Sequence, residues 1–200
     1  MTVEVRRLDG LAAVLEDCVT GGASVSFMAP FSHAQARDVF EEYAGEIERG
    51  RRLLLAAFDE GTVVGTVQVV FALPPNQPHR ADIAKLLVHR SARRRGIARL
   101  LMERAEADAV AVGKTLLVLD TVTGDDAERL YERLGYERVG VIPGYALYPD
   151  GRPCDTTVFF KTLEGSPASS SPISRTSQSS PLARRRCFTR RPSSTNPNLR

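Results

Sequence analysis

One segment restricts the fold more than any other: an apolar run that passes through a short basic loop into a long helix. Residues 81–88 have the length and apolar composition of a buried strand, and loop 89–95 contains four arginines. The longest amphipathic pattern of the chain, 96–112, begins directly after this loop at Gly96. A strand that leads at once into a helix favours helices layered on a sheet, which is an α/β fold.

The same junction has the chemistry of an anion site. The first N–H groups of a helix have no partner within the helix and lie at the positive end of its dipole. Gly96 and Ala98 are small, so a diphosphate could approach the backbone, and the nearby arginines add charge and forked donors. The alternative is a basic loop that caps the helix without a ligand. Neither G-x-x-x-x-G-K-[ST] nor G-x-G-x-x-G occurs, which argues against a P-loop NTPase and a Rossmann start.

Apolar periodicity and turn residues divide the rest of residues 1–164 into strands and helices. Gly10 is interpreted as the end of an opening strand, and Ser32 with Gln35 as a capping box. Pro143 and Gly144 predict a turn before the last strand. The strands are expected at 2–8, 53–58, 62–71, 81–88, 115–120, 136–141 and 155–162, and the helices at 11–19, 32–50, 96–112 and 124–134. The order β-α-α-β-β-β-α-β-α-β-β predicts a single domain with a mixed, mostly antiparallel seven-stranded sheet and helices on both faces.

The basic character of the chain is concentrated after residue 164. Residues 165–200 contain seven arginines, ten serines, five prolines and no acidic residue, whereas residues 1–164 carry 20 basic and 24 acidic residues. Such a segment cannot bury enough apolar surface to form a core, so 165–200 is predicted to be a disordered basic tail. Nucleic-acid binding through its arginines is an alternative, but the acidic domain argues against a specific nucleic-acid partner.

Cysteine and histidine usage predicts neither disulfides nor a metal site. Cys18, Cys154 and Cys187 lack C-x-x-C spacing, and the three histidines lack ligand spacing.

The chain has no apolar run of the roughly 18 residues that a membrane helix needs. Its first residues lack the pattern of a signal peptide. The expectation is a cytoplasmic protein with no membrane partner.

Two motifs resemble the GNAT family of N-acetyltransferases. Leu86-x-Val88 followed by Arg93-x-x-Gly96-Ile97-Ala98 resembles its central motif, where [QR]-x-x-G-x-[GA] holds the coenzyme A pyrophosphate. Ala127-x-x-Leu130-Tyr131-x-x-Leu134-Gly135-Tyr136 is similar to a second family signature. The resemblance covers residues 1–163 and implies an acyltransferase with acetyl-CoA as co-substrate. The coenzyme contacts that it implies are Leu86, Leu87, Val88, Arg93, Arg94, Arg95, Gly96, Ile97, Ala98 and Arg99.

A narrower resemblance concerns the acceptor. Residues 79–86, 119–121 and 142–145, with Pro149-Asp150-Gly151, look like the tabtoxin-resistance type of acetyltransferase. That resemblance implies an acceptor that is a small molecule with an amine, such as an antimicrobial or toxin amino acid. Dimers in this family form through several different edges, so the resemblance allows a homodimer but does not specify the oligomeric state. The alternatives are a protein N-terminal or lysine acetyltransferase and a module that senses acetyl-CoA without turnover.

The resemblance also implies the catalytic groups. The strands 81–88 and 115–120 are expected to splay apart, so that Asp82 and Asp120 flank the cleft and hold the ammonium and an ordered water. Close carboxylates would raise the pKa of one of them toward that of a useful base. Tyr131 is expected to protonate the leaving thiolate, which suits a hydroxyl with an ordinary pKa of about 10.

Each of these residues has a structural alternative. Asp120 could bind loop amides, Asp82 could pair with Arg80 or Lys85, and Tyr131 could be a core residue. The acceptor pocket is expected to include Phe27, Phe31 and Tyr145, from loop 20–32 and turn 143–150, although core packing explains the two phenylalanines nearly as well.

Overall fold

The computed structural model describes residues 5–163. Within them, six strands form one mixed sheet, and four α-helices lie against its faces. The elements are α1 (Val5–Thr20), α2 (His33–Glu48), β1 (Arg52–Asp59), β2 (Thr62–Val70), β3 (Arg80–Val88), a 3-10 turn η1 (Arg90–Ala92), α3 (Ile97–Ala111), β4 (Leu116–Val122), α4 (Asp126–Arg133), β5 (Glu137–Leu147) and β6 (Pro153–Thr162). The expected tail, 165–200, and Cys187 lie outside the described residues.

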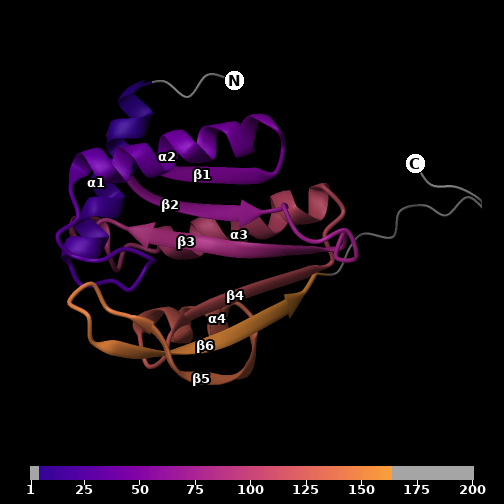
Figure 1. The fold of residues 1–200 in the computed structure, drawn as a ribbon. Helices are drawn as coiled ribbons and strands as arrows, with labels where there is room; N and C mark the ends of the chain where they lie inside the picture. Colours follow the sequence, from indigo (N-terminus) through magenta and orange to yellow (C-terminus); the bar gives the residue numbers. More distant parts are fainter. Residues whose placement is uncertain (1–4, 164–200) are drawn as a thin grey trace, which may run out of the picture. The chain divides into compact units, whose positions relative to one another are not determined.

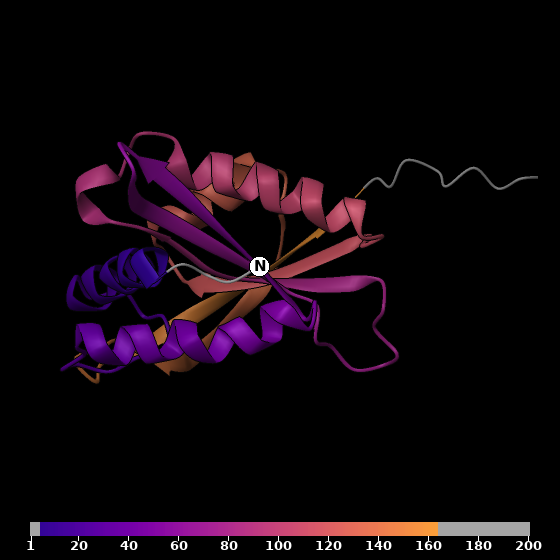
Figure 2. The ribbon, with the colours of Figure 1, turned by 90° about the horizontal axis from the view of Figure 1, so that it is seen from above.

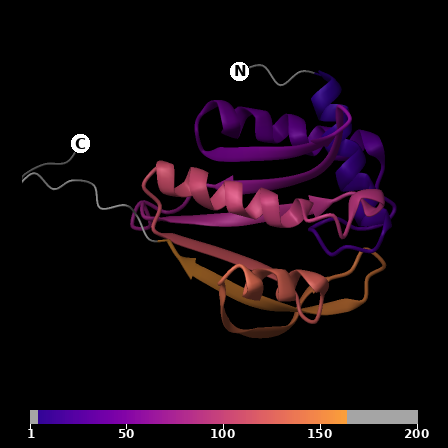
Figure 3. The same ribbon diagram turned by 180° about the vertical axis from the view of Figure 1, so that it is seen from behind.

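The sheet has the order β1-β2-β3-β4-β6-β5 (Figure 1). All neighbouring strands are antiparallel except β3 and β4, which are parallel. Helices α1 and α2 cover one face and α3 the other, as Figure 2 shows from above. Seen from behind in Figure 3, α4 lies on the same side as α3, over the β4-β6-β5 part of the sheet. The mixed sheet with helices on both faces agrees with the sequence prediction.

The predicted opening strand is wrong where the structure describes it. Residues 5–8 belong to α1, so the sheet has six strands in the described part of the chain, and residues 2–4 lie outside it. Gly10 does not end an element but lies inside the helix. A Cβ atom at Gly10 would come within 2.7 Å of Val63 Cγ2, so glycine here allows α1 to pack closely on β2.

The last hairpin also differs from the prediction. The fifth strand continues through Pro143 and Gly144 to Leu147, and its register with β6 shifts between Ile142 and Ala146. An edge strand tolerates a proline because the missing N–H need not face a neighbouring strand. The expected turn residues therefore produce an irregularity within β5.

Two apolar clusters hold the layers together. One packs α3 and α4 on the sheet around Phe159, Met102 and Leu117, all fully buried, and the other packs α1 and α2 on the opposite face around Leu15 and Phe40. The capping box of α2 is confirmed: Gln35 N donates to Ser32 Oγ, and Ser32 N donates to Gln35 Oε1 at 2.9 Å. Within residues 5–163, no helix has the length and apolar character needed to cross a membrane.

Candidate active site

Strands β3 and β4 part in the middle of the sheet. They pair only at Arg80 with Leu116, Ala81 with Leu117 and Asp82 with Val118. Beyond this point β4 stays paired with β6 as far as Val122, and β3 stays paired with β2. The divergence of the two strands is visible in Figure 1. It leaves the edges of β3 and β4 that face each other without a neighbouring strand.

A cavity of about 800 Å³ lies at this opening. Its walls come from the end of β3, the start of α3, the end of β4, α4, β5 and loop 23–28. Thirteen site residues expected from the sequence line it: Phe27, Leu86, Leu87, Val88, Arg93, Arg94, Gly96, Ile97, Ala98, Arg99, Asp120, Tyr131 and Tyr145. The structure thus brings together residues that are up to 118 positions apart in the chain.

Loop 89–96 between β3 and α3, which we call the coenzyme-motif loop, presents its backbone to open space. Arg94 and Gly96 both have positive φ, +63° and +79°, and Gly96 is the N-cap of α3 without a side-chain hydrogen bond. No atom lies within 4 Å of a Cβ placed at Gly96, so a ligand can approach this helix N-terminus. Arg94 crosses to α4, where its Nη2 donates to Asp126 Oδ2 at 2.7 Å.

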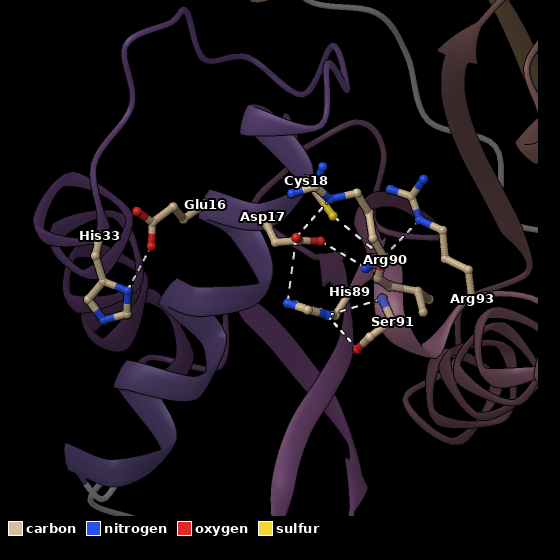
Figure 4. A network of polar contacts seen from close by, with 9 residues as sticks. Glu16, Asp17, Cys18, His33, His89, Arg90, Ser91 and Arg93 are labelled. Atoms are coloured by element: carbon tan, nitrogen blue, oxygen red, sulfur yellow. Dashed lines mark hydrogen bonds and ion pairs between the residues drawn. The ribbon is translucent and has the colours of Figure 1, made fainter.

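An ion-pair network on α1 fixes the start of this loop (Figure 4). Asp17 accepts hydrogen bonds from the backbone N and from Nε of Arg90, both at 2.8 Å, and its Oδ1 lies 3.6 Å from His89 Nε2. Burial acts to raise the pKa of Asp17, but the hydrogen bonds from Arg90 and the charges of His89 and Arg90 outweigh it and lower the pKa. The expected coenzyme contact Val88 O already accepts from Arg93 Nε at 3.2 Å.

A β-bulge in β3 places a lysine in the cavity. Thr66 pairs with Leu87 and Gln68 pairs with Ala84, so Lys85 and Leu86 stand opposite the single residue Val67. Lys85 has a φ of +51°, which is uncommon for a residue other than glycine. Its side chain lines the cavity and reaches the loop after α1. Burial lowers the pKa of Lys85 to about 8, Arg52 lowers it too, and Asp120 opposes both.

Asp120 and Tyr131 meet the same cavity from β4 and α4. Asp120 is exposed to the cavity, yet desolvation by the surrounding walls raises its pKa; Lys85 lowers the pKa and Asp82 raises it. The Tyr131 side chain is buried, with its ring centroid 5.9 Å from that of Phe159. Burial first, and then the charges of Asp120 and Asp125, raise the pKa of Tyr131, so its hydroxyl keeps the proton.

Three expected residues do not line the cavity. Asp82 accepts from Arg80 through both carboxylate oxygens, each 2.9 Å from Nη2, at the point where β3 and β4 still pair. Arg95 turns away to Asp59, with Nη1 2.8 Å from Oδ2. Phe31 supports the wall indirectly, because its ring stacks on Phe27 with centroids 4.6 Å apart.

Sequence reasoning did not assign to the site five ionisable residues that line the cavity: Cys18, Lys85, Asp125, Asp126 and Arg133. Only Lys85 gave a signal, as the one charged residue between Ile83 and Val88 in an otherwise apolar run. Cys18 and Cys154 are free, buried thiols. The described part of the chain contains no group of three or more metal-ligating side chains.

Comparisons with known proteins agree with a coenzyme A-dependent acyltransferase of this architecture. The model of the acetyltransferase (GNAT) family matches residues 19–136. The chain therefore belongs to the GNAT family and is an N-acetyltransferase, with acetyl-CoA as co-substrate.

Solved structures share the fold at low sequence identity. A putative phosphinothricin N-acetyltransferase is 22% identical with a TM-score of 0.69, over 82% of this chain and 97% of the other. A ribosomal-protein-alanine N-acetyltransferase from Brucella melitensis is 22% identical with a TM-score of 0.69, over 82% and 98%. A putative acetyltransferase from Salmonella typhimurium with its cofactor acetyl-CoA is 17% identical with a TM-score of 0.68, over 82% and 92%.

The cavity residues fit the charged end of acetyl-CoA. The open N-terminus of α3 offers backbone donors, and the Cβ-free position at Gly96 leaves room for a diphosphate. Arg93, Arg94 and Arg99 add positive charge along the same wall. The side chain of Arg94 is 85% exposed, so it can exchange Asp126 for a phosphate without leaving a buried charge unpaired.

Proposed function

We propose that this N-acetyltransferase acetylates the amine of a small molecule, such as an antimicrobial or toxin amino acid. The observation that carries the proposal is that Asp120 and Tyr131 line one cavity with the coenzyme-motif loop. Acetyl-CoA supplies an activated acetyl group as a thioester. The residues of the cavity must bind the donor, deprotonate the acceptor and return a proton to the sulfur.

Binding of the donor is assigned to α3 and β3. Backbone N–H groups at the start of α3, with Arg93, Arg94 and Arg99, hold the diphosphate. The edge of β3 at Leu86 and Leu87, which has no strand partner on the β4 side, binds the extended arm with strand-like hydrogen bonds. A main-chain N–H at this edge polarises the thioester carbonyl.

Deprotonation of the acceptor is assigned to Asp120. An alkyl amine reaches the cavity as an ammonium ion, because its pKa is near 10. The raised pKa of Asp120 makes its carboxylate a better proton acceptor than an ordinary aspartate, directly or through a water. Asp82 stays outside this step, because its carboxylate pairs with Arg80.

Protonation of the leaving group is assigned to Tyr131. As the new N–C bond forms and the C–S bond breaks, the Tyr131 hydroxyl donates its proton to the sulfur. The acylated nitrogen then loses its second proton, which restores the hydroxyl. The raised pKa of Tyr131 ensures that the hydroxyl is protonated at the start of each cycle.

The end of the cavity that is lined by residues 23–28 and Tyr145, which we call the acceptor end, favours a small substrate. Loop 23–28 is tied to the β5–β6 hairpin, because Ser24 Oγ donates to Leu147 O at 2.7 Å and Ala29 N donates to Pro149 O at 2.9 Å. Phe27 and Tyr145 line the cavity beside this junction. A loop held down at both ends favours an enclosed pocket over a groove for a peptide.

Free-thiol release tests the proposal. The intact protein is incubated with acetyl-CoA and a panel of small amines, amino acids and short peptides, and products are identified by mass spectrometry. Amine-dependent thiol release with an N-acetylated small molecule is the expected result. Preferential acetylation of peptide N-termini or lysines would show that the acceptor is a peptide or protein. Acetyl-CoA binding without turnover on any amine would indicate a sensor.

Two further expectations remain part of this proposal. A cytoplasmic location fits the free thiols of Cys18 and Cys154, since reduced cysteines are typical of that compartment. Assembly as a homodimer is compatible with this proposal. Beyond acetyl-CoA and the amine, the proposal requires neither a nucleic acid nor a membrane.

A further inference from the structure

The mechanism assigns no role to Lys85, a charged side chain that lines the cavity. Lys85 sits at the bulge of β3 in a backbone conformation that glycine adopts with less strain. Its side chain reaches the loop after α1, where it contacts Val25, Ser26 and Phe27.

The ammonium group is held in a fixed position. Lys85 Nζ donates to Val25 O at 2.6 Å and to Ser26 Oγ at 2.8 Å, and it lies 5.1 Å from the centroid of the Phe27 ring. An ammonium has three donors. The two bonds to the loop orient Nζ and leave one donor for a ligand in the cavity.

The charges around Lys85 complement a ligand that carries both signs. The charged groups that act on it are Arg52 from β1 and Asp120 from β4. Asp120 can accept the ammonium of an acceptor, and Lys85 offers a cation to a second group of the same molecule. Three of the four arginines in the lining have protein partners: Arg93 donates to Val88 O, Arg94 to Asp126 and Arg99 to Glu103.

We propose that Lys85 binds a carboxylate of the acceptor, so that the substrate is an amine that also carries this anionic group. The inference rests on the proposed function of the cavity and names the substrate class that its acceptor end selects. Asp120 and Lys85 then hold opposite ends of one zwitterion, and this orients the amine toward the donor.

Two other roles for Lys85 make different predictions. If the lysine only ties loop 23–28 to β3, its loss affects every acceptor alike. If it is the general base, its loss lowers kcat for every acceptor. A carboxylate-binding residue instead changes the discrimination between acceptors with and without the carboxylate, mainly through KM.

The test compares L-amino acids with their amides in matched pairs on the full chain. The readout is the ratio of kcat/KM for acid and amide, measured in the wild type, Lys85→Met and Lys85→Arg. Lys114→Met is the control, because Lys114 Nζ also donates to a backbone carbonyl, that of Pro78, and lies over a phenylalanine ring, that of Phe71, but outside the cavity. A retained acetyl-CoA thermal shift shows that each variant is folded.

We expect the wild type to prefer the acid and Lys85→Met to reduce the acid-to-amide ratio at least about tenfold through the KM of the acid. Lys85→Arg should restore part of the ratio, and Lys114→Met should leave it unchanged. An equal loss for acid and amide, or an unchanged ratio, would overturn the assignment. Acetylation only of amines that lack a carboxylate would overturn it while leaving the proposed function intact, whereas no acetylation of any amine would overturn both.

A second measurement does not depend on how the Lys85→Met variant folds. In the wild type, the KM of the acid should rise above about pH 8, where Lys85 loses its proton, relative to the KM of its amide. Parallel pH dependence of the two KM values would contradict the proposal.

Discussion

Asp17, near the end of α1, binds both the backbone N and the side-chain Nε of Arg90, a residue 73 positions further along the chain. This pair connects the helix layer on one face of the sheet to the loop that leads into α3 on the other (Figure 4). The geometry of the coenzyme-motif loop therefore depends on a residue outside the motif.

Asp17→Asn should weaken this connection. The amide keeps one acceptor oxygen but loses its charge, so we expect a loss of about 1–2 kcal/mol in the free energy of unfolding. Since the pKa of Asp17 is lowered in the native state, the extra stability of the wild type over Asp17→Asn is fully present above the pKa of Asp17 in the unfolded state. This extra stability is lost as the pH falls through the native pKa.

We also expect a several-fold loss in acetyl-CoA affinity. Chemical denaturation at several pH values measures the loss of stability, and titration with acetyl-CoA measures the loss of affinity. Asp9→Asn is the control, because Asp9 lies on the same helix and pairs with Arg37 away from the cavity. Equal acetyl-CoA affinity in the wild type and Asp17→Asn would show that the loop keeps its geometry without this contact.

Gly96→Glu should abolish the rise in Tm that acetyl-CoA causes. The change places bulk and negative charge at the N-terminus of α3, where the diphosphate is assigned. It also forces a side chain onto a residue with φ +79°. Gly113→Glu controls for that strain, because Gly113 has the same φ and open surroundings but lies outside the cavity. A normal ligand-induced shift in folded Gly96→Glu would refute the diphosphate assignment.

Tyr131→Phe should bind acetyl-CoA normally and lower kcat at least about tenfold, because it removes the proton donor and leaves the ring in place. The ring contacts with Tyr136 and Phe159, at centroid distances of 5.7 and 5.9 Å, do not involve the hydroxyl. Tyr136→Phe is the matched control, since Tyr136 does not line the cavity. If kcat were the same in the wild type and Tyr131→Phe while chemistry limits the rate, Tyr131 would have a packing role only.

The elements with a local signal could be predicted from the sequence. The strand before the basic loop, the helix after Gly96 and the capping box of Ser32 each follow from residues that lie next to one another. The family resemblance singles out Asp120 and Tyr131, and both line the cavity.

The remaining features depend on contacts between distant segments. From the sequence alone, Gly10 is interpreted as the end of a strand, because no local pattern indicates that Val63 of β2 occupies the space beside it. The point where β3 and β4 part decides that Asp120 faces the cavity and Asp82 pairs with Arg80, and no local pattern specifies that point. The bulge at Lys85 inserts one residue relative to β2, which alternation within β3 alone does not indicate.

Residues 165–200 are predicted to be dispensable for acetyl transfer. Truncation after Glu164 removes the segment rich in serine, proline and arginine and leaves the domain that the sequence defines. We expect less than about 1.4 kcal/mol of change in unfolding free energy and less than about tenfold change in kcat/KM. A larger effect in either measurement would place the domain boundary later in the chain.

The most direct test of the central claim is the pH profile of acetyl transfer in Asp120→Asn. Because the native pKa of Asp120 is raised, wild-type kcat/KM should fall as the pH drops through that pKa, and the ionised carboxylate should destabilise the native state above it. We predict that Asp120→Asn loses most of its kcat/KM and the acidic limb, yet is at least as stable as the wild type near pH 8. The control Asp108→Asn should have wild-type activity, because Asp108 lies on α3 outside the cavity and pairs with Arg104. Wild-type activity with an unchanged acidic limb in Asp120→Asn would contradict the account.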